Sequence, residues 1–368
     1  MRNAVVILPS FNEAENIAPL IKKIEEINKK LVNWDINILV VDSYSTDNTG
    51  NVVKDLQKTI PTLHIIEVPK EGLGKAYLRG FNYAINKFNP YLIIQMDADY
   101  QHDPERLTEF FEQIQKGADF VVGTRYSKGG SIPKNWAIHR KILSIGANLF
   151  IRLGFMKLKT SEWTNGYRAI KTWVIKGALD HIKNYSGYVF QVAMIDYALK
   201  NNAKMSEIPV NFKERKFGIS KINASQYVFQ IIQYVLTHSS FIKFVIVGLI
   251  GFGVDFGISY LGIQKFHQAV WLITLLSTET AIVSNFILNN FWSFRYKKIE
   301  GGTGNYLMSF LKFNLVSSGS IAIQTIGMQI LVGVFGRDLW YLYKILIIAF
   351  VIIPYSYILY NKFIWKNK

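Results

Sequence analysis

The last third of the chain is nearly free of charge, and this restricts what the chain can fold into more than any other feature. Residues 241–368 hold 15 charged side chains among 128 residues and contain four apolar stretches, 241–262, 270–291, 309–334 and 340–361. A helix needs about 20 apolar residues to cross a bilayer. Four such stretches joined by short polar links are hard to accommodate in one soluble core. They predict an all-α transmembrane domain of four helices.

Basic residues beside these stretches predict the orientation of the domain. They gather in the second connection and in the tail: Arg295, Lys297, Lys298, Lys362, Lys366 and Lys368. The first connection holds Lys265, and the third holds Arg337 beside Asp338. Lysine and arginine are enriched in cytoplasmic loops. Since the apolar run Val5–Leu8 is too short for a signal peptide, we expect the N-terminal part, the second connection and the C-terminus in the cytoplasm.

The first 125 residues alternate between strand-like and helix-like segments. The predicted strands are 4–10, 36–42, 63–68, 91–97 and 119–124, and the predicted helices between them are 14–30, 46–58, 74–87 and 104–116. Such alternation is typical of an α/β fold, with a mostly parallel sheet covered by helices on both faces. Ligands of these sheets bind at the carboxyl ends of the strands. We therefore expect the functional site at that edge.

Asp97 and Asp99 stand one residue apart at the end of the predicted strand 91–97, after an apolar run. Residues at i and i+2 project from the same face of a strand, so the two carboxylates are able to hold one divalent cation. Mg²⁺ and Mn²⁺ prefer oxygen ligands, and Mg²⁺ is usually held by one or two carboxylates together with substrate phosphates. A solvated strand end is the alternative for this pair on its own. The pattern predicts a metal site for a phosphate-containing substrate.

The middle of the chain is strongly basic. Residues 116–240 hold 19 Lys and Arg against 6 Asp and Glu. Such a segment suits nucleic acid, an anionic membrane surface or a phosphate substrate, and the apolar domain that follows favours the membrane. A basic segment, 135–155, and a second segment, 223–240, have apolar residues at helical spacing, which is typical of helices in the membrane interface. Covering the sheet is the alternative for both.

Seven motifs resemble those of family 2 glycosyltransferases and occur in the same order. They are LPSFNEAENI (8–17), VDSYSTDNT (41–49), GLGKA (72–76), MDADYQHDPE (96–105), GTRY (123–126), NGYRAI (165–170) and ERKFGISKI (214–222). The chain is most similar to dolichyl-phosphate mannose synthases and polyprenyl-phosphate glucosyl relatives, over residues 3 to about 222. The apolar domain, including ETAIVSNFILNNFWSF (279–294), resembles the GtrA-like membrane domain of some synthases.

This resemblance implies a GT-A type domain with a mixed sheet over 1–222, an interface helix at 223–240 and a membrane domain over 241–368. It implies metal-dependent transfer of a hexose, most readily mannose from GDP-mannose, to dolichyl or polyprenyl phosphate at the cytoplasmic side of the cell membrane. A phosphate monoester is largely ionised at neutral pH, so it needs no catalytic base and displaces the nucleotide with inversion. Nucleic acid need not be invoked, and the oligomeric state stays open.

The resemblance also assigns roles to individual residues. Those expected around the nucleotide sugar are Pro9, Phe11, Glu13, Val40, Asp42, Asp97, Ala98, Asp99, Gln101, Arg125, Arg215 and Lys221. Asp97, Asp99 and Gln101 are expected to hold Mg²⁺ or Mn²⁺. Arg125, Arg140 and Ser144 are expected to hold the acceptor phosphate. Asp99, Arg125 and Arg215 are expected to be catalytic, with guanidinium groups on phosphate oxygens.

Three positions depart from the family pattern and bear on the choice of donor. Ser43 stands where the family usually has a second acid, Glu162 where it often has Asp, and Ala193 where Glu is common. These positions lie near the expected sites of the base and the sugar. They leave both GDP-mannose and UDP-glucose open as donors, and the reaction type is less affected.

Other functions fit the same domains less well. A processive polysaccharide synthase shares the Asp-x-Asp sheet domain but needs a Gln-x-x-Arg-Trp motif, and the sequence contains no Arg-Trp pair. A lipid-linked sugar translocator or a scaffold would use the membrane domain as its active part. Asp255 and Glu279 lie inside predicted spans, where an acid is a candidate functional residue. They either line a path for a lipid or a partner or hydrogen-bond between helices.

Overall fold

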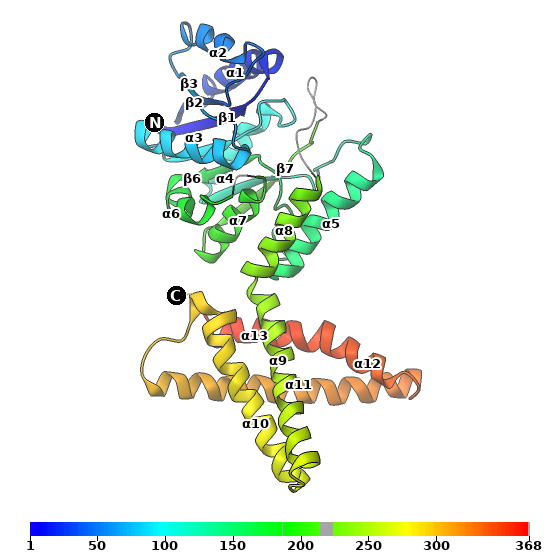
Figure 1. Ribbon diagram of the computed structural model, residues 1–368. Coiled ribbons are helices and arrows are strands. Elements are labelled where there is room, and N and C mark those ends of the chain that lie inside the picture. Colours follow the sequence, from blue (N-terminus) through cyan, green and yellow to red (C-terminus); the bar gives the residue numbers. More distant parts are fainter. Residues whose placement is uncertain (186, 214–223, 367–368) are drawn as a thin grey trace. The chain divides into compact units, whose positions relative to one another are not determined.

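The computed structural model describes residues 1–185, 187–213 and 224–366 (Figure 1). The chain forms two compact units, Met1–Val235 and Leu236–Lys368. Arg215 and Lys221, which the sequence places at the nucleotide sugar, lie outside the described residues.

A seven-stranded sheet forms the centre of the described part of the first unit. Its strands are β1 (Arg2–Ser10), β2 (Trp34–Asp42), β3 (Leu63–Glu67), β4 (Leu92–Gln95), β5 (Phe120–Thr124), β6 (Arg168–Lys171) and β7 (Met205–Pro209). The order across the sheet is β3-β2-β1-β4-β6-β5-β7. Strands β1 to β4 pair in parallel, whereas β6 is antiparallel to β4 and β5. The expected mixed α/β sheet is confirmed.

Helices cover both faces of this sheet, as the apolar strands require. The helices of the unit are α1 (Ala14–Asn28), α2 (Thr49–Gln57), α3 (Leu73–Phe88), α4 (Leu107–Gln115), α5 (Ile138–Phe155), α6 (Thr172–Ile182), α7 (Phe190–Lys200) and α8 (Ala224–His238). Helices α1 and α4 share one buried cluster with Val6 and Ile38. On the other face, α3 approaches so closely that a Cβ on Gly80 would lie 3.0 Å from the side chains of Ile7 and Val41.

The carboxyl ends of the parallel strands form the edge at which the site residues gather. Ser10 is in register with Asp42 at the ends of β1 and β2. Strand β4 ends at Gln95, so the expected strand 91–97 is too long at this end. Asp97 therefore lies in the turn that follows β4. The rule that side chains at i and i+2 project from the same face of a strand does not apply to it there.

The second unit is helical. Its elements are α9 (Ser240–Tyr260), η2 (Leu261–Lys265), α10 (Val270–Leu288), η3 (Asn289–Ser293), η4 (Arg295–Lys297), α11 (Thr303–Phe335), α12 (Trp340–Ile347), η5 (Ile348–Ile352) and α13 (Ile353–Phe363). Together they make four helical stretches in the described chain that are long and apolar enough to cross a membrane: Ser240–Lys265, Val270–Ser293, Thr303–Phe335 and Trp340–Phe363. These agree with the four expected stretches, and the third begins earlier than the apolar run predicted.

The two acids inside the spans differ in their surroundings. The Ser277 hydroxyl of α10 donates a hydrogen bond of 2.6 Å to the Asp255 carboxylate of α9, and Thr278 donates a longer one of 3.4 Å. Asp255 thus joins two helices, which is one of the two roles left open by the sequence. Glu279 is exposed on α10.

Candidate active site

Two adjoining cavities open at the carboxyl ends of the strands. The β1 cavity measures about 460 Å³ and is bordered by the loop after β1 and by the turn Asp97–Asp99. The α5 cavity measures about 370 Å³ and is bordered by one side of α5 and by β5's carboxyl end. Four residues line both cavities: Leu73, Asp97, Tyr188 and Tyr227. A ligand that occupies both cavities therefore passes Asp97.

The loop after β1 is tied to the loop after β2, and this fixes the floor of the β1 cavity. The Asn12 amide donates to Ser45 Oγ (2.9 Å), and the Asn12 side chain accepts from the Thr46 amide (2.9 Å). The Glu13 amide donates to Thr49 Oγ1 (2.9 Å). Asn12 adopts a positive φ of 58°, which asparagine tolerates better than most residues. Hydrogen bonds within the protein therefore hold the loop in this shape.

Apolar and cationic groups meet among the residues that line the β1 cavity. Pro9, Phe11 and Glu13 line it, as does Ser43. The Lys70 ammonium lies 3.6 Å from the centroid of the Phe11 ring, within the range of a cation–π contact. An aromatic ring beside a cation suits a flat base attached to phosphates.

Val40 and Asp42, which the resemblance assigns to the nucleotide sugar, are not among the residues that line the β1 cavity. Both are buried. Ser10 Oγ donates to Asp42 Oδ1 (3.0 Å), and the Ser45 amide donates to Oδ2 (2.8 Å). In the described structure, the Asp42 carboxylate therefore holds the two loops together.

The turn Asp97–Asp99 brings carboxylate oxygens, which are able to bind a metal ion, to the β1 cavity. The side chains of Asp97 and Asp99 both line it, with Ala98 between them. Asp99 is buried, and its Oδ1 accepts from the Gln101 amide (3.0 Å). Gln101 lines the α5 cavity, where its side-chain amide donates to the Lys213 carbonyl (3.3 Å). Two carboxylates with room beside them fit a hard divalent cation that takes its other ligands from a diphosphate.

His102 positions this turn. The Asp97 amide donates to His102 Nδ1 (3.0 Å), so the ring proton lies on Nε2 and is donated to Asn165 Oδ1 (2.9 Å). Asn165 is anchored in turn by donating to the Gly123 carbonyl of β5 (2.6 Å). Burial lowers the pKa of His102 from 6.5 to about 4. The ring is neutral at pH 7, as acceptance at Nδ1 requires.

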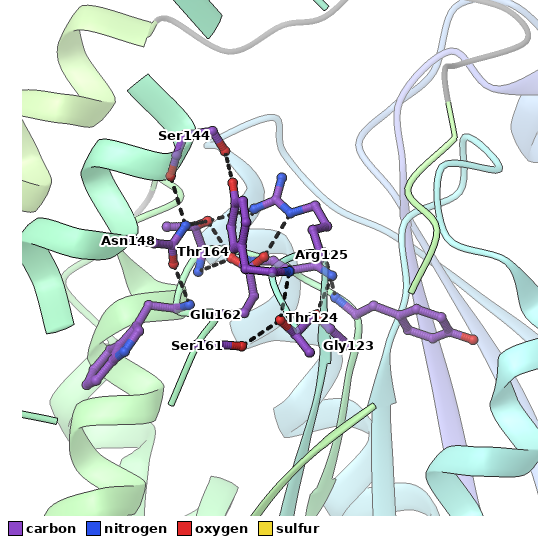
Figure 2. A network of polar contacts seen from close by, with 12 residues as sticks. Gly123, Thr124, Arg125, Ser144, Asn148, Ser161, Glu162 and Thr164 are labelled. Carbon is purple, nitrogen blue, oxygen red and sulfur yellow. Dashed lines mark hydrogen bonds and ion pairs between the residues drawn. The ribbon is translucent and has the colours of Figure 1, made fainter. Parts of the chain in front are cut away.

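Arg125 and Glu162 form a buried ion pair at the carboxyl end of β5 (Figure 2). Arg125 Nε and Nη2 donate to the two Glu162 oxygens at 2.8 and 2.9 Å, and Nη2 also donates to Thr164 Oγ1 (2.9 Å). Burial disfavours the charge on the guanidinium, but the adjacent Glu162 outweighs it and raises the pKa of Arg125. Nη1 has no hydrogen-bond partner within the described residues, and Arg125 lines the α5 cavity.

Helix α5 is held against this network by Asn148, as Figure 2 shows. Asn148 accepts from the Trp163 amide (2.7 Å) and donates to the Ser144 carbonyl (3.0 Å) and to Thr164 Oγ1 (3.1 Å). This fixes which side of α5 faces the cavity. Arg140 and Ser144, four residues apart, both line it.

The structure brings together most of the residues that the sequence assigned to the site. Those lining one or both cavities are Pro9, Phe11, Glu13, Asp97, Ala98, Asp99, Gln101, Arg125, Arg140 and Ser144. Lining residues that sequence reasoning missed include Lys70, Tyr188, Gln191 and Tyr227. Tyr188 and Gln191 lie in the segment GYVFQVAM (187–194), which drew notice only for Ala193. Nothing in the residue type of Tyr227 distinguishes it from the other aromatic residues of α8.

Solved structures of similar shape include glucosyl-3-phosphoglycerate synthase from Mycobacterium tuberculosis in complex with Mn²⁺ and UDP-glucose. It is 18% identical with a TM-score of 0.46, over 64% of this chain and 78% of that one. The same protein in complex with UDP gives 16% identity and a TM-score of 0.45.

Curated relatives match this chain over most of their own length. Polyprenol monophosphomannose synthase of Mycolicibacterium smegmatis is 32% identical over 61% of this chain and 82% of that protein. Undecaprenyl-phosphate mannosyltransferase of Micrococcus luteus is 32% identical over 60% of this chain and 87% of that protein. Dolichol-phosphate mannosyltransferase of Pyrococcus furiosus is 29% identical over 86% of this chain and 87% of that protein. This match extends into the second unit.

Two family descriptions divide the chain between them. Residues 5–176 match Glycosyl transferase family 2, and residues 243–365 match the GtrA/DPMS transmembrane domain. The first range contains the sheet edge, the Asp97–Asp99 turn and α5, and the second contains the four apolar helical stretches. The chain therefore belongs to glycosyl transferase family 2, as a membrane glycosyltransferase with a C-terminal GtrA/DPMS transmembrane domain.

Proposed function

We propose that this chain transfers mannose from GDP-mannose to dolichyl or another polyprenyl phosphate, with inversion at the anomeric carbon. The observation that carries the proposal is the pair of cavities that meet at Asp97. The β1 cavity has the residues expected for a nucleotide diphosphate, and the α5 cavity has the cationic residues expected for a second phosphate. Three curated relatives named as polyprenyl-phosphate mannose transferases support this choice of sugar and acceptor.

Asp97 and Asp99, with Gln101 beside them, would hold Mg²⁺ or Mn²⁺ together with the donor diphosphate. The metal would neutralise charge that develops on the leaving nucleotide. Asp97 borders both cavities, so the bond to be broken would lie between nucleotide and acceptor. Arg215 and Lys221 are proposed to contribute further positive charge to the same phosphates.

Arg125, Arg140 and Ser144 would hold the acceptor phosphate in the α5 cavity. The guanidinium of Arg125 stays charged because Glu162 raises its pKa, and its Nη1 offers a donor toward an anion. A phosphate monoester oxygen is already nucleophilic at neutral pH. Orientation and charge stabilisation would thus carry the reaction without a general base.

The lipid acceptor requires that the α5 cavity lie near a bilayer. Helix α5 presents exposed apolar side chains on its outer side, namely Ile138, Ile142, Ile145, Leu149 and Leu153. Basic residues accompany them on the same helix, including His139, Arg140 and Lys141. This composition suits an interface helix at an anionic surface. We propose that α5 and α8 lie in the cytoplasmic interface and that the second connection and the C-terminus are cytoplasmic as well.

The test is mannose transfer by the full chain in detergent, with radiolabelled GDP-mannose and a polyprenyl phosphate. We expect label in the lipid in the presence of Mg²⁺ or Mn²⁺ and its loss with EDTA. UDP-glucose is run in parallel because the departures at Ser43, Glu162 and Ala193 concern the donor. Transfer from UDP-glucose alone, or no transfer from GDP-mannose under any condition, overturns the proposed function.

Asp99→Asn tests the metal assignment within this assay. Asparagine keeps an oxygen that accepts from the Gln101 amide, so the turn is expected to fold. It loses the negative charge that a divalent cation needs, and we expect a fall in transfer of roughly 100-fold or more. Glu71→Gln, an exposed carboxylate paired with Arg79, is the control and should keep full transfer. Full activity of Asp99→Asn at limiting metal would exclude Asp99 as a ligand.

A further inference from the structure

Gln191 has an unusual environment for a polar residue. It lies in the first turn of α7, its side chain is fully buried, and it lines the α5 cavity. Neither its Oε1 nor its Nε2 has a hydrogen-bond partner in the described part of the chain. Buried amides are nearly always paired, so an orphaned one indicates a missing partner.

The backbone of Gln191 is fixed, which argues against a side chain in a loosely packed position. The Arg168 guanidinium, itself fully buried, donates from Nη1 to the Gln191 carbonyl (2.7 Å). The same guanidinium donates to the carbonyls of Trp163 and Asn165 (2.9 and 2.8 Å). Arg168 thereby locks the start of α7 to the turn that contains Gly166. The amide of Gln191 is presented from a rigid support.

Gly166 keeps the space between this amide and the reaction centre open. A Cβ on Gly166 would lie 3.2 Å from Gln191 Nε2 and 3.6 Å from Asp97 Oδ1. The orphaned amide and the carboxylate shared by the two cavities therefore flank the same glycine. A group that sits beside Asp97 and carries hydroxyls would find both a donor and an acceptor on Gln191.

We infer that Gln191 binds a hydroxyl of the transferred sugar and thereby contributes to the choice of donor. The inference rests on the proposed function, since it needs a sugar held at Asp97. A site built to hydrogen-bond a substrate hydroxyl discriminates strongly against an analogue that lacks it, because the protein group is then left buried without a partner. Gln191 is a specificity residue in this sense. It supplies no proton and no charge.

Gln191→Met tests this, because methionine is of similar length and fills the same space without hydrogen-bonding groups. Transfer is measured with GDP-mannose and with analogues that each lack one sugar hydroxyl. In the wild-type chain, one analogue should lose on the order of 10- to 100-fold in kcat/KM relative to GDP-mannose. In the variant, kcat/KM for GDP-mannose should fall by a similar factor. The value for that analogue should fall little below the value that the wild-type chain shows with it. The Kd for GDP, which carries no sugar, should not change.

Gln95→Met is a matched control. Gln95 is also fully buried with both amide atoms unpaired in the described structure, but it is not among the residues lining either cavity. Its variant should leave the ranking of the analogues as in the wild type. An equal loss for every donor in Gln191→Met, or unchanged kcat/KM, overturns the inference while the proposed function stands. A wild-type chain inactive with GDP-mannose overturns the proposed function and this inference with it.

Discussion

His102 holds the Asp97–Asp99 turn through an acceptor, Nδ1, that exists only on the neutral ring. Protonation at Nδ1 would turn this atom into a donor facing the Asp97 amide, and the hydrogen bond would be lost. Asn165 and the stacked ring of Tyr167, 4.8 Å away between centroids, keep the imidazole in place. The residue next to the Asp-x-Asp turn is therefore a positioning residue that is sensitive to acid.

This predicts a specific pH dependence of stability. Burial lowers the pKa of His102 from 6.5 to about 4, so the unfolded chain takes up this proton first as the pH falls. The contribution of neutral His102 to the free energy of unfolding is therefore complete above pH 6.5 and is lost as the pH falls from 6.5 to 4. Between pH 7 and pH 5 it amounts to about 2 kcal/mol. The full chain in detergent should lose several degrees of apparent melting temperature over this interval for this reason.

His102→Gln isolates that contribution, since glutamine does not titrate while all carboxylates titrate as before. We expect the variant to melt lower at pH 7 but to lose less between pH 7 and pH 5 than the wild type. The measurement is the melting temperature by tryptophan fluorescence at both pH values. Equal losses in the two proteins would show that His102 is not the titrating group.

The sequence was informative about residues whose chemistry stands out and silent about residues whose role comes from burial. Asp97 was expected at the site because two carboxylates, Asp97 and Asp99, stand one residue apart at a strand end, and Arg125 was expected there because GTRY (123–126) resembles a family motif. Gln191 could not be predicted, because a glutamine in an apolar helix stands out only when the structure shows that its buried amide has no hydrogen-bond partner among the described residues. Arg125 needed the structure for another reason, since its bidentate bond to Glu162 joins segments far apart in the chain.

Helix α5 has two functional sides at the level of the element. One side places Arg140 and Ser144 on the α5 cavity, and the other exposes apolar side chains such as Ile142, which is 64% exposed. Since the two sides belong to one rigid helix, contact of the outer side with lipid would bring the cavity to the headgroup. If both proposed roles hold, the element links membrane contact to acceptor binding.

Ile142→Glu should weaken this link without disturbing the reaction. A carboxylate on the outer side opposes contact with an anionic interface, so we expect KM for polyprenyl phosphate in anionic vesicles to rise about 10-fold. Transfer to a short-chain acceptor in detergent should be unchanged. Val32→Glu, an exposed apolar position after α1, is the control and should alter neither assay. Equal loss in vesicles and detergent would mean that α5 acts only within the fold.

The strands and helices were predictable to different degrees, for reasons of length and period. Strands β1 and β2 are long apolar runs, each followed by a helix, and the sequence locates both. Strand β6 has four residues, Arg168–Lys171, and directly precedes α6, so no alternation marks it. Its antiparallel insertion between β4 and β5 depends on pairing across the sheet, which local periodicity cannot reveal.

For the whole molecule, the apolar runs set the number of spans, and the charge pattern sets their expected direction. The four runs were predictable because about 20 apolar residues in succession have few alternatives. The third helix begins at Thr303 rather than near 309, since its first turns are polar and continue the helix beyond the apolar run. Hydropathy predicts the apolar part of a helix, but it does not predict where polar residues continue the helix beyond that part.

The predicted orientation can be tested directly because the chain contains no cysteine. A single cysteine is introduced into the first connection with Gln268→Cys, at an exposed position, or into the second with Gly302→Cys, where a Cβ meets open space. Arg295, Lys297 and Lys298 in the second connection favour the cytoplasm. In intact cells, a membrane-impermeant maleimide should therefore label Gln268→Cys at once and Gly302→Cys only after permeabilisation. The cysteine-free parent reports background labelling, and the reverse pattern would place the sheet domain on the opposite side from its proposed nucleotide donor.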